Sequence, residues 1–170
     1  GLLLIAALAC TGPGHGEGLT MAEAEQVRQE VEQTLRSAYD LSRPGAAERM
    51  LALYPTSGRV LSTVGGRVTT SRDSLEAGIR YFWENVGVNM RDPRWVWDSM
   101  YVDALSPTVA GVTASYHIPH LNPRGEPHVL GGAMTAVMVK RDGKWVVLQE
   151  HLSDLPQTSN PASNDSVHSR

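Results

Sequence analysis

The stretch VLGGAMTAVMVKRDGKWVVLQEHLS, residues 129–153, decides the fold. It contains two runs rich in β-branched and other apolar residues, 129–140 and 144–153, separated by the turn sequence Arg141-Asp142-Gly143. Runs of this length joined by a tight turn are typical of neighbouring antiparallel strands. We therefore predict two long strands of one antiparallel sheet in this part of the chain.

Two more strands are predicted upstream, at residues 94–105 and 109–118, joined by Ser106-Pro107-Thr108. A longer loop around residues 122–125 leads into the third long strand. Because most connections are short, a meander of adjacent antiparallel strands is the simplest topology. Gly131-Gly132 inside the third strand predicts a bend or bulge that lets the sheet curl.

Helices are predicted before the strands. Thr20, with Glu23 three residues later, has the pattern of a capping box, and apolar residues then recur at helical spacing up to Tyr39. A second, shorter helix is expected from Ala46 to Tyr54, because Pro55 prevents its continuation.

A small hairpin and a third helix follow. Gly65-Gly66 is a two-residue turn signal between residues 59–64 and 67–70. Ser71 is placed to cap a helix over residues 72–85. Helices first and strands later predict an α+β fold.

The composition fits one globular domain, which we expect over residues 20–156. The chain has 170 residues, of which 41% are hydrophobic and 19% charged, and its net charge is −3. We expect no nucleic-acid partner, because no cluster of Lys and Arg could neutralise a phosphate backbone. The segment 157–170 is rich in Ser, Asn and Pro and is predicted to be a disordered tail.

The first ten residues, GLLLIAALAC, form an apolar run too short to span a bilayer. The run resembles the lipobox of bacterial lipoproteins, and this implies lipidation of Cys10. We expect residues 1–10 to be a truncated signal segment and residues 11–19 a flexible tether, with the protein anchored in the cell envelope at the periplasmic or extracellular face. The alternatives are an ordinary export signal or a buried N-terminal segment.

Several segments together resemble the SnoaL-like branch of the nuclear transport factor 2-like superfamily, over about residues 22–156. They are Leu53-Tyr54-Pro55, Ser71-Arg72-Asp73, the turn and strand start at 141–147, and Glu150-His151-Leu152-Ser153. The resemblance implies a cone-shaped fold in which a curved sheet wraps a long helix. It also implies a small, mostly apolar ligand or an active site at the open end, and a homodimer formed through the outer face of the sheet.

Period-two alternation in the last strand puts Gln149, His151 and Ser153 on the same face as Trp145 and Val147. In similar proteins this face looks into the cone. His151 is therefore our first candidate for a general acid or base. The alternatives are that it orients the pocket through one hydrogen bond or lies at a subunit contact.

Tyr39 and Asp40 end the first helix, where pocket residues of the superfamily often stand, and are the candidate catalytic partners of His151. Alternatively, Tyr39 is a core tyrosine and Asp40 only caps the helix end. Steroid isomerases of the superfamily carry a carboxylate just after the second helix, where this chain has Pro55-Thr56-Ser57-Gly58. Isomerase chemistry of that kind is not expected.

Further residues are expected to line the pocket: Tyr54, Trp83, His117, Gln149 and Ser153. Tyr39, Asp40, Tyr54 and His117 loosely resemble the set found in dehydratases of the superfamily, although His117 and His120 also fit exposed strand ends. The row of Trp95, Trp97, Ser99 and Tyr101 favours core or dimer interface over a ligand cage.

No cofactor is expected. The spacings of His117, His120, His128 and His151 match no compact metal-ligand set, so we predict no metal site. Gly65-Gly66 lacks the Lys-Ser/Thr of a phosphate loop. Two functions remain: a domain that binds a small molecule or a partner, and a cofactor-free lyase, isomerase or hydrolase that uses His151 with Tyr39 or Asp40.

Overall fold

The structure is a computed structural model that describes residues 18–155. The predictions for residues 1–10, for lipidation of Cys10 and for the tail 157–170 lie outside the described residues, as does most of the tether 11–19. Within residues 18–155, no helix combines the length and apolar character needed to cross a membrane.

The three predicted helices are present. α1 spans Met21–Ala38 and begins with the predicted capping box, in which the Thr20 hydroxyl accepts a hydrogen bond from the Glu23 amide. α3 spans Arg72–Asn85 and is capped by Ser71, and the short 3-10 helix η1, Gly87–Asn89, follows it. α2, Ala46–Leu51, is shorter than predicted, because the amides of Leu53 and Tyr54 bond three residues back in tight turns.

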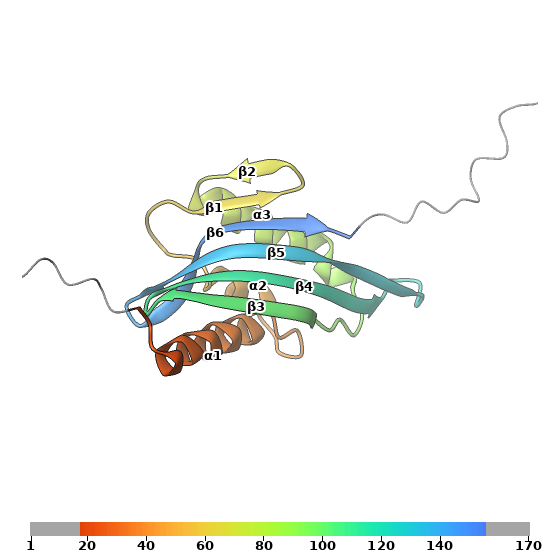
Figure 1. Cartoon of the computed structure of the whole chain (residues 1–170). Helices are drawn as coiled ribbons and strands as arrows, with labels where there is room; N and C mark the ends of the chain where they lie inside the picture. The colour runs from red at the N-terminus through yellow and green to blue at the C-terminus, as the bar shows by residue number, and fades with distance from the viewer. Residues whose placement is uncertain (1–17, 156–170) are drawn as a thin grey trace, which may run out of the picture.

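Six strands form one sheet in the order β2-β1-β6-β5-β4-β3. Their bounds are β1 Leu61–Val64, β2 Arg67–Thr69, β3 Val96–Ser106, β4 Val109–Leu121, β5 Pro127–Arg141 and β6 Lys144–Asp154. The last four form the predicted antiparallel meander, whereas β1 pairs in parallel with β6. Figure 1 shows the long strands curving past α1, with the β1–β2 ribbon beside β6 at the edge of the sheet.

The hydrophobic core lies between the helices and the concave face of the sheet. α1 contributes Val27, Val31 and Leu35, which recur every fourth residue and so share one side of the helix. They belong to one buried cluster with inward residues of the long strands, among them Val112 and Met138. The predicted α+β class is therefore confirmed.

Three register shifts interrupt the alternation of side chains, at Asp98 and Leu105 in β3 and at Leu148 in β6. Each is an extra residue relative to the neighbouring strand. An extra residue of this kind, a β-bulge, moves every following side chain to the other face. After Leu148 the inward position belongs to Glu150, and His151 is exposed.

Gly131 and Gly132 occupy a stretch without a register shift, so the predicted bulge is not there. A Cβ atom on Gly132 would lie 1.8 Å from the carbonyl oxygen of Ser153, and one on Gly131 would lie 2.6 Å from that of Tyr116. The glycines are needed because neighbouring backbone passes close to both positions. Gly65 and Gly66, with φ of 54° and 76°, form the predicted hairpin turn.

Candidate functional site

Glu150 is the most unusual residue of the interior, because it is a carboxyl group with only 3% of its surface exposed. Its Oε1 accepts hydrogen bonds from the hydroxyl groups of Tyr54 and Ser62, each at 2.7 Å. Its Oε2 is buried and has no hydrogen-bond partner among the described residues. One carboxyl oxygen thus accepts two hydrogen bonds, and the other is buried without any.

Three elements bring this cluster together. The bulge at Leu148 turns Glu150 inward on β6, and the parallel pairing of β1 sets Ser62 directly opposite it. Tyr54 comes from the turn that follows α2. The Leu53 carbonyl accepts a 2.6 Å hydrogen bond from the Val147 amide, which fixes this turn against β6.

Burial controls the electrostatics of the cluster. It raises the pKa of Glu150, although the hydrogen bonds from Ser62 and Tyr54 favour the charged form. Burial also raises the pKa of Tyr54 and of Tyr39, and the negative charge of Glu150 adds to both effects. Burial raises the pKa of Tyr116 to about 12, with contributions from Asp154 and Glu150. The site therefore holds a buried carboxyl group of raised pKa beside buried phenols whose pKa values are also raised.

Aromatic side chains form the wall next to this cluster. The ring of Trp95 lies 4.2 Å from that of Tyr39 and stacks on Tyr116 at 4.3 Å. Trp97 meets Tyr39 edge-on at 5.4 Å. The indole Nε1 of Trp95 is buried and has no hydrogen-bond partner in residues 18–155. The interior thus contains one unused donor as well as the unused acceptor of Glu150.

The predicted aromatic row divides at the bulge of β3. Trp97 pairs with Tyr116 on the inner face, and Ser99 pairs with Ser115 on the outer face. Trp95 and Trp97 pack against the core, as favoured from the sequence, while Tyr101 lies 66% exposed on the other side. The predicted common face for all four residues is therefore wrong, because alternation restarts after Asp98.

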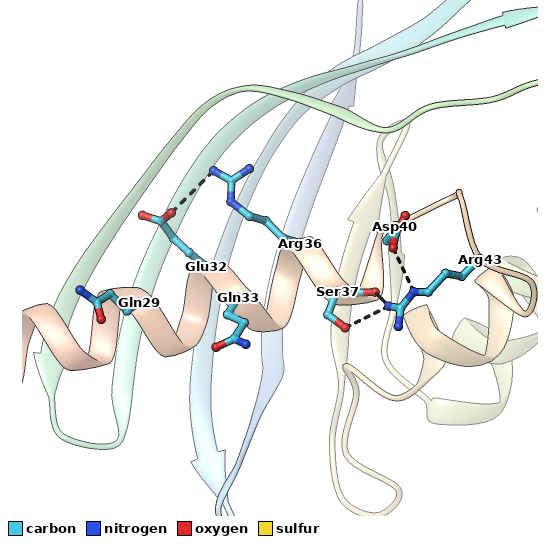
Figure 2. A pocket seen from close by; sticks show the side chains of 7 residues that line it. All are labelled: Gln29, Glu32, Gln33, Arg36, Ser37, Asp40 and Arg43. Carbon is cyan, nitrogen blue, oxygen red and sulfur yellow. Dashed lines mark hydrogen bonds and ion pairs between the residues drawn. The ribbon is translucent and has the colours of Figure 1, made fainter.

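Asp40 is outside the interior. Its Oδ1 accepts hydrogen bonds from the Ser42 amide at 3.0 Å and hydroxyl at 2.6 Å, and its Oδ2 pairs with Arg43 at 2.9 Å. These bonds, led by those from Ser42, lower the pKa of Asp40. Figure 2 shows this ion pair just after α1, where both residues help to line a shallow surface depression together with polar side chains of the helix. The alternative role, at the helix end, is the one that the structure supports.

His151, Gln149 and Ser153 are exposed, so the prediction that they face into the cone is wrong. The bulge at Leu148 separates them from the face of Trp145 and Val147. The described residues include no hydrogen bond between His151 and Tyr39 or Asp40. The combination of side chains predicted as a catalytic set is therefore not assembled.

His117 also lies away from the interior, where its Nδ1 is 2.8 Å from Asp98 Oδ1 on the partly exposed outer side. Of the other predicted residues, Tyr39 and Tyr54 are buried in the interior. Trp83 is half-buried at its edge and donates from Nε1 to Met50 Sδ at 3.3 Å. Thus only the tyrosines of the predicted set belong to the cluster around Glu150.

Glu150, Ser62 and Trp95 were not predicted as site residues. One signal for Glu150 was present, since it is a charged residue in the middle of the strand face that alternation assigned to Val146, Leu148 and Leu152. A charge in such a row indicates either solvent exposure or a buried polar role. Ser62 carried no comparable signal, because its parallel partner lies 88 residues away.

Comparison with known proteins identifies the fold. Neither a protein-family model nor a curated protein sequence matches the chain. A proposed dehydratase of the nuclear transport factor 2-like family from Streptomyces avermitilis is similar in structure, with a TM-score of 0.64 and 15% identity, over 78% of this chain and 99% of that chain. A proposed scytalone dehydratase from Novosphingobium aromaticivorans has a TM-score of 0.62 and 20% identity, over 79% and 89%.

A third similar structure is a nuclear transport factor 2-like protein of unknown function from Shewanella oneidensis, with a TM-score of 0.58 and 17% identity, over 75% of this chain and 99% of that chain. These similarities in structure, together with the curved sheet and its helices, define the fold class. The chain has the cone-shaped nuclear transport factor 2-like fold.

Proposed function

We propose that this protein is a SnoaL-like domain that binds a small organic molecule inside the cone, with Glu150 as the polar anchor. The observation that carries the proposal is the buried Oε2 of Glu150 without a partner among residues 18–155. Leaving a buried polar atom unpaired costs about 1–3 kcal/mol. A ligand that donates a hydrogen bond to Oε2 would remove this cost, so the cluster favours binding of such a ligand.

The surroundings of Glu150 favour one chemical class of ligand. Trp95 and Tyr39 offer aromatic surface, which favours a mostly apolar molecule with a ring. A hydroxyl or amine on the molecule would donate to Glu150 Oε2, and a carbonyl or ether oxygen would accept from Trp95 Nε1. This pairing of one donor and one acceptor distinguishes the proposed ligand from a simple hydrocarbon.

A second candidate function is catalysis by a cofactor-free lyase, isomerase or hydrolase, with Glu150 in the acid-base role first assigned to His151. The observation that favours it is the raised pKa of Glu150, because a carboxyl group that can both hold and release a proton is suited to proton transfer. Tyr54, which donates to the same carboxyl group, is the residue that positions it.

The test is a thermal-shift screen of the full chain against a library of small ring compounds with hydroxyl and carbonyl groups, using Glu150→Gln and His151→Ala. His151 is the matched control, since it neighbours Glu150 in sequence but is exposed. We expect ligand-induced stabilisation to be lost in Glu150→Gln and kept in His151→Ala. Equal loss in both variants, or loss only in His151→Ala, would contradict the proposal.

Mass spectrometry of each bound compound after incubation distinguishes binding from catalysis. A change in mass or retention that depends on Glu150 supports the enzyme. Recovery of unchanged ligand after binding supports the non-catalytic domain.

We also propose that the protein is an exported lipoprotein anchored through Cys10. The support is the apolar run of residues 1–9 that ends at this cysteine. Labelling with a fatty-acid analogue in a bacterial host is expected to mark the wild type and not Cys10→Ala. Unchanged labelling and unchanged membrane association of Cys10→Ala would exclude the anchor.

We also propose that the protein forms a homodimer through the outer face of the sheet. Five outer residues lie in register across five strands, and the row is Thr63, His151, Thr135, Thr113 and Tyr101. Tyr101 is 66% exposed and Tyr81 on α3 is 67% exposed, so the two form a matched pair. Sedimentation is expected to show a dimer that Tyr101→Glu dissociates and Tyr81→Glu does not. A monomeric wild type would refute the proposal.

A further inference from the structure

A cleft of about 700 Å³ lies at the end of the sheet where β4 finishes and β5 begins. The segment between η1 and β3 forms one wall, and Leu41 and Ser42 after α1 contribute to the rim. Neither Glu150 nor the tyrosines that surround it line this cleft. The cleft is thus a second site, and its chemistry is independent of the function proposed for the first.

Arg91 and Arg94 lie in this wall, where their backbones are held by hydrogen bonds but their guanidinium groups form no ion pair with residues 18–155. The amide and carbonyl groups of Arg91 exchange hydrogen bonds with Leu121, both at 2.9 Å, and the Arg94 amide donates to the Pro119 carbonyl at 3.2 Å. The Arg94 guanidinium has no hydrogen bond or ion pair to any residue of 18–155, and that of Arg91 makes one long contact, 3.4 Å, to the Asn122 carbonyl. The backbone contacts fix the Cα atoms from which both side chains extend at the cleft.

A pair of histidines, His120 and His128, also lines the cleft. The Nδ1 of His120 lies 2.9 Å from the carbonyl oxygen of Ile118, so this nitrogen carries the proton. The Nε2 of His120 must then accept from the Nδ1 of His128, 3.1 Å away. The remaining nitrogen, Nε2 of His128, has no partner among the described residues. This chain of bonds orients both rings and leaves one polar atom at the cleft.

The charges of the cleft select a singly charged anion. Among the described residues, Asp92 is the one acidic residue that lines the cleft. Together with Arg91 and Arg94, it leaves a net charge of one positive unit when both imidazoles are neutral. The planar guanidinium group matches a carboxylate in shape and in hydrogen-bond geometry. Apolar side chains such as Leu121 and Val129 offer surface to the rest of the molecule.

We propose that this cleft binds a small organic carboxylate, with the anionic group between Arg91 and Arg94 and the hydrocarbon part against Leu121 and Val129. The recognised chemistry is a monoanionic carboxylate on an apolar body.

The test uses phenylacetate and its neutral counterpart phenylacetamide as probes, with inorganic phosphate as a third. Binding to the full chain is followed by isothermal titration calorimetry and by NMR shifts of backbone amides. We expect phenylacetate to bind at least about tenfold more tightly than phenylacetamide or phosphate, with shifts centred on residues 91–94 and 119–129. Arg91→Gln and Arg94→Gln should each weaken binding about tenfold, the effect of losing one charge-assisted contact.

The matched control is Arg67→Gln, which removes an exposed arginine on β2 outside the cleft and should leave the affinity unchanged. Glu150→Gln should also leave it unchanged, so failure of the interior site and failure of the cleft are distinguishable. Equal affinity for the acid and the amide, tighter binding of phosphate, or full affinity in the Arg91→Gln/Arg94→Gln double variant would overturn the proposal.

Discussion

Replacement of Glu30 by glutamine tests how α1 is held to the sheet. Glu30 Oε2 accepts hydrogen bonds from Lys140 Nζ at 2.7 Å and from Trp145 Nε1 at 2.8 Å. Lys140 belongs to β5 and Trp145 to β6, so one carboxylate joins a helix to two strands. The bonds from Lys140 and then from Trp145 and Gln26 lower the pKa of Glu30 from 4.5 to about 2.

The lowered pKa of Glu30 gives the size of its contribution to the free energy of unfolding. A fall from 4.5 to about 2 corresponds to roughly 3.4 kcal/mol at about 1.36 kcal/mol per pKa unit. The Glu30 and Lys140 side chains are 31% and 28% exposed, so water screens part of this interaction. Glutamine also keeps an acceptor for Trp145. We therefore expect Glu30→Gln to lower the free energy of unfolding at pH 7 by about 1–2 kcal/mol.

The assay is urea unfolding followed by tryptophan fluorescence from pH 8 down to pH 3. The lowered pKa of Glu30 means that its contribution is fully present above the ordinary value of 4.5 and is lost as the pH falls toward 2. The difference between wild type and Glu30→Gln should thus be constant above about pH 5 and shrink below it.

Glu32→Gln is the matched control, because Glu32 lies on the same helix but pairs with Arg36 at 3.6 Å in an exposed position. Glu32→Gln should lower the free energy of unfolding by less than about 0.5 kcal/mol. The reasoning would be refuted if Glu30→Gln were no more destabilising than Glu32→Gln, or if the loss at pH 7 persisted unchanged at pH 3.

Three further changes test other parts of the fold. Because burial raises the pKa of Glu150, its contribution to stability is present at low pH and is lost as the pH rises through the raised pKa. The free energy of unfolding of Glu150→Gln, minus that of the wild type, should therefore be larger at pH 8 than at pH 4. Urea unfolding at the two pH values measures this difference, and an equal difference at both contradicts the prediction. Gly132→Ala places a Cβ atom 1.8 Å from the Ser153 carbonyl oxygen and should lower the free energy of unfolding by about 2 kcal/mol or more. In the control Gly111→Ala the Cβ atom meets open space, so urea unfolding should show a far smaller loss. Thr20→Ala removes the hydroxyl of the capping box and should cost about 1 kcal/mol, visible as a lower melting temperature by circular dichroism; an unchanged melting temperature would show that the cap does not contribute.

The candidate site was only partly predictable. Tyr39 and Tyr54 were expected at the pocket because the family resemblance implies pocket residues at these places, and both are in the interior. Asp40 was expected beside Tyr39, but its local bonds to Ser42 and Arg43 hold it outside. His151 was expected inside from strict alternation, and the extra residue Leu148 reverses that assignment.

The sequence by itself determined the features that depend on near neighbours. The capping box of Thr20 and Glu23, the Gly65-Gly66 turn and the cap of α3 at Ser71 each form between residues within three positions of one another. Such signals can be read directly, because their hydrogen bonds and backbone angles are local. The same holds for the meander, whose strands are joined by short turns.

Only the tertiary structure decided which strand face is buried beyond Asp98 and Leu148 and which residues meet around Glu150. A bulge inserts one residue into a pattern of period two, and alternation alone carries no mark of where this happens. The contacts of Glu150 come from Tyr54 and Ser62, 96 and 88 residues away. Since those bonds exist only once β1 lies parallel to β6, the site is a product of packing between distant segments.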